Sequence, residues 1–246
     1  MSITGILVYV DTSPDSDVRV DVAVRLARRS DAYVTAAGLE EAAIGPRDRF
    51  LRVLSQEQLQ GEWQTIIGLP VSHLTRHAAG HDLLVLGQRD PSYSNGLDAP
   101  EDVILGCGRP VVVVPYGRPV NPLGGHVLVA WNGSREAKRA VQDALPVMAL
   151  CDGITVLLVN PEEDEDIALQ AELVTHLARH GLNALAESTT IASGVVHDAI
   201  HKRAKELGAE LIVMGAYGHS RLRETILGGV THDMLLETTR PLLMSH

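Results

Sequence analysis

One glycine-rich segment near the C-terminal end has the residue types and spacing needed to hold a phosphate group. Gly215 and Gly218 follow an apolar run, and Gly228, Gly229 and Thr231 come later. A glycine has no Cβ, so its backbone N–H can approach a phosphate oxygen closely, and a helix N-terminus adds N–H donors and a favourable dipole. The spacing predicts a loop that holds an anion from two sides. The alternative is that these glycines only end a strand and break a helix.

The elements that would position this segment occur twice in the chain. Three apolar landmarks recur in the same order, which indicates an internal duplication. The matching pairs are Ile6–Asp11 with Val127–Asn132, Leu83–Gly87 with Leu211–Gly215, and Arg109–Val111 with Arg240–Leu242. The stretch 115–125 between the copies is rich in proline and glycine, so we expect one domain over residues 1–118 and a second over 126–246.

Within each copy, short apolar runs rich in β-branched residues alternate with helical periodicity. This pattern predicts the α/β fold class, with a five-stranded parallel sheet and helices on both faces of each sheet. The expected strands lie near 5–11, 33–39, 62–67, 82–87 and 110–115, and near 126–132, 154–159, 185–191, 210–215 and 240–244. A helix is expected after Ser134, with an apolar face formed by Ala137, Ala140, Val141, Ala144, Leu145 and Met148.

Composition limits the classes of partner. Charged residues make up 21% of the chain and the net charge is −10, without a basic stretch, so nucleic acid is not an expected partner. No apolar run approaches the ~20 residues that span a membrane, and no targeting segment is evident, so we expect a cytoplasmic protein. Cys107 and Cys151 are expected to be small buried apolar residues, with a single disulfide as the alternative.

The longer pattern resembles the nucleotide-binding signature Gly-x2-Gly-x9-Gly-(Ser/Thr) of the universal stress protein family. The resemblance extends through both copies. It implies two tandem Rossmann-like domains of the adenine-nucleotide α-hydrolase type, with ATP or AMP bound in the second copy, with or without Mg²⁺. One position departs from the family, because Gly229 stands where the signature has a hydroxyl residue, whereas Thr231 matches a second hydroxyl position.

The resemblance also implies which residues surround the nucleotide. The adenine and ribose would face the ends of the first two strands of the second copy, and the phosphates would face the glycines. The implied residues are Ala130, Trp131, Asn132, Val159, Met214, Gly215, Gly218, His219, Gly228, Gly229, Val230 and Thr231. Asn132 stands where the family usually has Asp, but an amide can still donate and accept hydrogen bonds. Trp131 is equally well explained as a strand residue that packs on a helix.

The first copy keeps Asp11 but lacks the phosphate-binding pattern. After Gly87 there is no second glycine at the right spacing and no later Gly-Gly-x-Thr. We therefore expect a vestigial or purely structural site there and one nucleotide per chain. We also expect the copies to pack as an intramolecular pseudo-dimer through their last strands, 111–114 and 242–244, with a homodimer as a further possibility.

Two histidine pairs and one acidic run have spacings that metals can use. His73 with His77 and His197 with His201 are each one helical turn apart, but no carboxylate or cysteine completes either set at helical spacing. We expect surface histidines and no metal site. The acidic run 162–166 is expected to be a solvated loop whose last acids lie at a helix N-terminus.

Two functions of different class remain. The first is a stress-response protein that binds an adenine nucleotide in its second copy and acts as a regulatory or adaptor module on a protein partner that the sequence does not identify. Catalysis would be limited to slow ATP hydrolysis, because no general base can be named. The alternative is a nucleotide-free interaction protein, in which Gly229 and Asn132 are signs of a decayed site.

Overall fold

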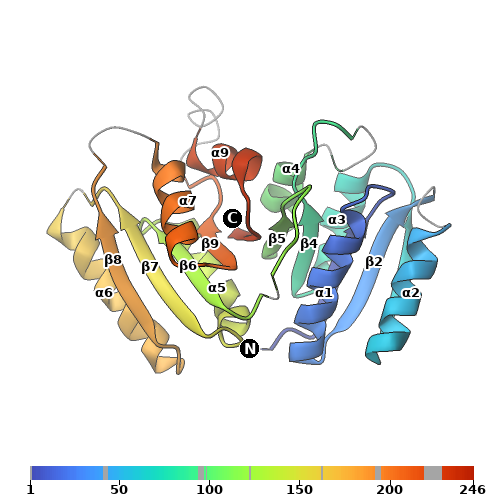
Figure 1. Ribbon diagram of the computed structural model, residues 1–246, viewed down its shortest axis with the longest axis horizontal. Helices are drawn as coiled ribbons and strands as arrows, with labels where there is room; N and C mark the ends of the chain where they lie inside the picture. Colours follow the sequence, from blue (N-terminus) through green and yellow to red (C-terminus); the bar gives the residue numbers. More distant parts are fainter. Residues whose placement is uncertain are drawn as a thin grey trace. The chain divides into compact units, whose positions relative to one another are not determined.

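The computed structural model describes residues 2–40, 44–93, 97, 99–121, 123–161, 163–191, 195–218 and 229–246. The chain divides into two compact units, Met1–Leu123 and Gly124–His246. In both units, strands and helices alternate along the chain (Figure 1).

The first unit is a parallel sheet with strand order β3-β2-β1-β4-β5. Its strands are β1 (Gly5–Val10), β2 (Tyr33–Leu39), β3 (Gly61–Ile66), β4 (Leu83–Gly87) and β5 (Val111–Val114). Its helices are α1 (Ser16–Ser30), α2 (Pro46–Glu57), α3 (Pro70–His77) and α4 (Pro100–Gly106), with a short 3-10 helix at Ala78–Gly80.

The second unit repeats this plan, with strand order β10-β9-β6-β7-β8 and parallel pairing throughout. Its strands are β6 (His126–Trp131), β7 (Gly153–Val159), β8 (Ala184–Thr189), β9 (Leu211–Gly215) and β10 (Leu242–Ser245). The described helices are α5 (Arg135–Met148), α6 (Asp164–Arg179), α7 (Val196–Glu206) and α9 (Val230–Glu237).

The strand order of each unit reverses beside its first strand. The second and third strands extend the sheet to one side of β1 or β6, and the fourth and fifth extend it to the other. Because parallel crossovers are right-handed, this reversal places the first two helices on one face and the last two on the opposite face. In keeping with this, α1 packs against α2, α3 against α4, and α7 against α9. The expected α/β class with parallel sheets is confirmed, and ligands bind such folds at the point of reversal.

The helices cover the sheets through apolar faces. Helix α5 begins after the N-cap Ser134, whose Oγ accepts a hydrogen bond from Ala137 N at 3.1 Å. Its expected apolar face is buried except for Leu145, which is half-buried. Within the described part of the chain, no helix combines the length and apolar character needed to cross a membrane.

The cysteines differ from the expectation in one respect. Cys107 and Cys151 are not joined by a disulfide, and both are half-buried rather than buried. Cys107 directly follows α4 and Cys151 lies three residues after the end of α5. The thiol of each donates to a backbone carbonyl, that of Arg109 at 3.3 Å and that of Val147 at 3.2 Å. Both positions lie in turns after a helix, which accounts for the partial exposure.

Candidate functional site

A pocket of about 690 Å³ lies at the carboxyl ends of β6, β7 and β9 in the second unit. It lies beside the point of reversal, since β6 is the strand from which the sheet extends both ways. It is lined by Ala130, Trp131, Asn132, Ser134, Leu157, Leu158, Val159, Asn160, Asp166, Val196, Ile200, Met214, Gly215, Gly218, Gly229, Val230 and Thr231. Every expected site residue within the described ranges is in this set, whereas His219 and Gly228 lie outside the described residues.

Sequence reasoning missed part of the lining. The missed residues are Ser134, Leu157, Leu158, Asn160, Asp166, Val196 and Ile200. Val196 and Ile200 share one face of α7, and no motif points to them. Asn160 did carry a signal, because an asparagine directly after an apolar strand often adopts left-handed backbone; its φ is 53°.

Packing requires a glycine at position 215, and this residue also lines the pocket. A Cβ on this residue would lie 2.4 Å from Ala137 N and 2.6 Å from the carbonyl carbon of Glu136. The first turn of α5 therefore approaches β9 so closely that no side chain fits at Gly215. Gly218 is less constrained, because its Cβ would meet only side-chain atoms, Glu136 Oε2 at 3.0 Å and Ser134 Oγ at 3.3 Å.

Thr231 joins the two described ends of the glycine-rich segment. Its Oγ1 accepts a hydrogen bond from the backbone N–H of Tyr217 at 3.1 Å, and the residue is only 4% exposed. Because the hydroxyl accepts this bond, its own hydrogen can be donated to a ligand oxygen. Gly229 is the N-cap of α9 and has no side chain to cap the helix, and the first backbone N–H groups of a helix have no partner within the helix itself.

Two amide side chains hold the loops after β6 and β7. Asn132 Oδ1 accepts from the backbone N–H of Ser134 at 3.2 Å, and Asn160 Oδ1 accepts from that of Ile191 at 2.8 Å. The oxygens of both amides are used within the protein, so their NH₂ groups are the donors that they can offer to a ligand.

Two carboxylates lie at different places in or beside the pocket. Glu163 is the N-cap of α6 and forms a capping box with Asp166, as expected for the last acids of the acidic run, although Glu162 lies outside the described residues. Asp166 lines the pocket. Glu136 is buried beside Gly218, and its Oε1 accepts from Arg135 Nε at 3.0 Å.

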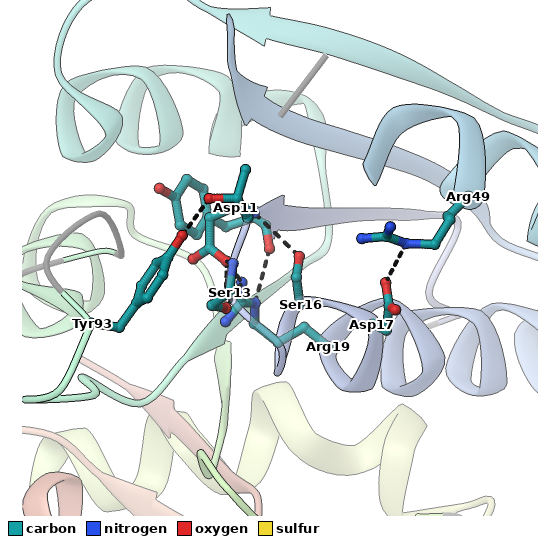
Figure 2. A network of polar contacts seen from close by, with 9 residues as sticks. Asp11, Ser13, Ser16, Asp17, Arg19, Arg49 and Tyr93 are labelled. Carbon is teal, nitrogen blue, oxygen red and sulfur yellow. Dashed lines mark hydrogen bonds and ion pairs between the residues drawn. The ribbon is translucent and has the colours of Figure 1, made fainter. Parts of the chain in front are cut away.

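In the first unit, side chains fill the corresponding place at the ends of β1 and β4. Arg19 Nη2 lies 2.5 Å from Asp11 Oδ1, and both side chains are buried (Figure 2). Arg19 Nε also donates to the carbonyl of Tyr9 at 3.2 Å, and Ser13 Oγ donates to Asp11 at 2.5 Å. A Cβ on Gly87 would lie 2.6 Å from Arg19 Nη1, and only about 20 Å³ of cavity remains.

The histidine pairs do not all match the expectation of surface histidines. His73 and His77 stack on α3 with ring centroids 4.1 Å apart, and burial, followed by the charges of His77 and Arg76, lowers the pKa of His73. His197 is buried, so the expectation of a surface histidine is wrong for this residue, and carboxylates on α9 lie against its ring. These carboxylates come from another helix, which is why spacing within one helix did not reveal them.

Comparison with known proteins finds similarity to universal stress proteins in both sequence and structure. Residues 125–246 match the model of the universal stress protein family. A universal stress protein of Methanocaldococcus jannaschii is 35% identical over 54 residues, or 22% of this chain and 33% of that protein. A universal stress protein of Synechocystis sp. is 25% identical over 210 residues, or 84% of this chain and 66% of that protein. The matched stretches thus span about a third and just under two thirds of these relatives.

Structural similarity extends over both units. The crystal structure of a universal stress protein from Archaeoglobus fulgidus aligns with a TM-score of 0.75 and 18% identity, covering 98% of this chain and 95% of that chain. At this level of identity, the similarity establishes a shared fold.

Proposed function

We propose that this chain, which carries a universal stress protein domain over residues 125–246, binds one adenine nucleotide, ATP or AMP, in the pocket of its second unit. Through that binding it acts as a regulatory or adaptor module in a stress response. The observation that carries the proposal is that the described residues implied by the nucleotide-binding signature all line one pocket at the point of strand reversal. Its volume of about 690 Å³ lies in the usual range for small-molecule sites.

The lining offers a surface for each part of a nucleotide. Leu157, Ile200 and Met214 are apolar and suit the faces of an adenine ring. Asp166 supplies carboxylate oxygens that accept hydrogen bonds from hydroxyls such as those of ribose. The sugar would therefore lie toward the start of α6.

The phosphates would lie on the opposite side, between Gly218 and the start of α9. The backbone N–H groups in the first turn of α9, whose N-cap Gly229 has no side chain, and the hydroxyl of Thr231 would supply donors there. Asp166 is the only carboxylate among the described pocket residues, so Mg²⁺ would be held mainly by the phosphates that it accompanies.

The first unit supports a single nucleotide per chain. The Arg19 guanidinium lies where a ligand would enter beside Gly87, and it is held by Asp11. Binding there would need the displacement of a buried ion pair, which leaves an uncompensated charge.

The test compares two glycine variants of the full chain. Gly218→Val places a branched side chain in the pocket, and we expect ATP and AMP to bind at least tenfold more weakly, about 1.4 kcal/mol, by isothermal titration. The matched control is Gly80→Val, because a Cβ on Gly80 meets no atom within 4 Å. Gly87 is unsuitable as a control, since its Cβ would meet Arg19.

Nucleotide released from the purified, denatured protein identifies the natural ligand. A parent chain that releases no nucleotide, binds neither ATP nor AMP and gains no thermal stability from them would support a nucleotide-free interaction protein instead. Equal affinity in the parent and Gly218→Val would place any binding elsewhere in the chain.

A further inference from the structure

Helices α7 and α9 bring a histidine and three carboxylates together outside the pocket lining. The two helices pack against each other (Figure 1). His197 and Asp198 lie in the first turn of α7, and Asp233 and Glu237 lie one turn apart on α9. His197 is only 7% exposed.

The distances within this cluster are longer than those of close ion pairs and are compatible with a metal site. His197 Nε2 lies 3.3 Å from Glu237 Oε2 and 3.5 Å from Asp198 Oδ1. A charge-assisted N–H···O bond is shorter, about 2.7–2.9 Å. Four ligands bound at ~2.0–2.2 Å in a tetrahedron lie about 3.3–3.6 Å from one another. One atom from each of the three side chains lies within 4.8 Å of the others.

The other ring nitrogen of His197 has a carboxylate on its own side. Nδ1 is buried without a hydrogen bond that meets ordinary geometry, and Asp233 Oδ2 lies 3.4 Å from it. In metal sites, the nitrogen that does not bind the metal commonly donates to a carboxylate, which fixes the tautomer and the ring orientation. Asp233 lies on the side of the ring where such a carboxylate is needed.

We propose that His197, Asp198 and Glu237 bind one divalent metal ion, with Zn²⁺ as the best fit, and that Asp233 positions the histidine. Zinc accepts imidazole nitrogen and carboxylate oxygen as ligands, and three protein ligands leave a fourth position for water. Mg²⁺ fits poorly, because it prefers oxygen ligands in a regular octahedron.

The other histidine pairs provide an internal comparison. His73 with His77 on α3, and His176 with His180 on α6, have rings 4.1 Å and 4.7 Å apart. Among the described residues, neither pair has a carboxylate within ion-pair distance, unlike His197. A shared spacing of one helical turn therefore does not explain the cluster.

A metal at this place would join two helices that form one side of the pocket. Val196 and Ile200 of α7 and Val230 and Thr231 of α9 all line that pocket. The ion would fix α7 to α9, so we expect it to stabilise the fold whether or not a nucleotide is bound.

The test is a titration of Zn²⁺ into the full chain after treatment with a chelator, without nucleotide. We expect one tight site, and a rise in the thermal unfolding temperature on binding. Glu237→Gln and Asp198→Asn should each weaken this site at least tenfold and abolish the rise. Their side chains are 61% and 70% exposed, so the substitutions leave the fold intact. Asp233→Asn should weaken the site by about 10- to 100-fold, as other changes to such supporting carboxylates do.

The matched controls are His77→Gln and His180→Gln, which alter a histidine pair that has no carboxylates among the described residues. We expect both to bind Zn²⁺ as the parent does. The proposal is overturned if Glu237→Gln and Asp198→Asn bind Zn²⁺ like the parent, if the loss appears in a control instead, or if the parent has no tight site.

Discussion

Thr231 holds the backbone beside the pocket and, in the proposed complex, also contacts the nucleotide. Its hydroxyl holds the backbone of Tyr217, which has left-handed backbone with φ 57°, at the start of a segment that ends next to α9. The sequence signature implies Thr231 as a ligand residue but cannot reveal this second contact, because the bond depends on where the end of β9 and the start of α9 lie in the fold.

We predict that Thr231→Val weakens ATP binding by roughly fivefold, since a net hydrogen bond is worth about 1 kcal/mol. The matched control is Thr238→Val, which removes another buried hydroxyl, one that donates to the carbonyl of Arg240 at 2.6 Å. Both variants should lose some stability in urea, but only Thr231→Val should lose affinity by isothermal titration. Equal affinity in the two variants would remove Thr231 from the binding site.

The position of the Arg19 side chain in the first unit could not be predicted from the sequence. Missing glycines indicated that the first copy lacks a phosphate loop, but nothing in the spacing of α1 indicated that Arg19 would fill the site. Its position depends on the ion pair with Asp11 and on the absence of a side chain at Gly87.

We predict that Arg19→Met destabilises the chain by about 3 kcal/mol or more in urea unfolding, because it leaves Asp11 buried without its cation. Adding Asp11→Asn to this variant should recover much of the loss, since no buried charge remains. If Arg19→Met unfolds at the same urea concentration as the parent, the ion pair does not hold this region together.

At the scale of elements, the sequence predicted the strands well. All ten described strands lie within about two residues of the expected positions. Eight of them are short, largely buried apolar runs, which are the easiest strands to predict, whereas β3 and β8 are mostly half-buried or exposed. Contacts between helices were not predictable in this way. The approach of Glu237 on α9 to His197 on α7 depends on which helices share a face of the sheet.

One contact between elements makes a prediction about pH. Arg203 on α7 donates two hydrogen bonds to Glu187 on β8, at 2.6 and 2.7 Å. These bonds lower the pKa of Glu187 from its usual 4.5, even though burial opposes the shift. A carboxyl whose pKa is lower in the folded state stabilises the fold above its unfolded pKa, and this contribution is lost as the pH falls through the folded pKa.

We therefore predict that Glu187→Gln lowers the free energy of unfolding at neutral pH and that its difference from the parent closes as the pH falls below 4.5. The matched control is Glu62→Gln on β3, the corresponding strand of the first unit, because Glu62 pairs with no cation among the described residues. Urea unfolding at several pH values measures both. A difference that stays constant from neutral to acid pH would contradict the assignment.

At the scale of the whole molecule, the two units share one strand order but differ in the space left at the carboxyl ends of their strands. The second has an open pocket of about 690 Å³, and the first has about 20 Å³ left around an ion pair. The duplication was visible in the sequence because apolar strands repeat. The difference between the two sites could be predicted only in part. The missing glycines are visible in the sequence, but the side chains that fill the site of the first unit belong to no motif.

We further propose that the units pack as an intramolecular pseudo-dimer. Taken by itself, each sheet ends in an apolar strand, β5 or β10, and an uncovered apolar edge invites pairing. A compact chain of this length has a radius of gyration of about 18 Å, which small-angle X-ray scattering measures directly. A clearly larger value with a broad distribution of distances would indicate units joined by a flexible linker.

The central claim is that the second unit alone binds an adenine nucleotide, and native mass spectrometry of the full chain with increasing ATP tests it most directly. The account predicts that one ATP binds per chain, that Gly218→Val loses it at the same concentrations, and that Gly80→Val keeps it. Two bound nucleotides per chain, or none in the parent, would contradict the account.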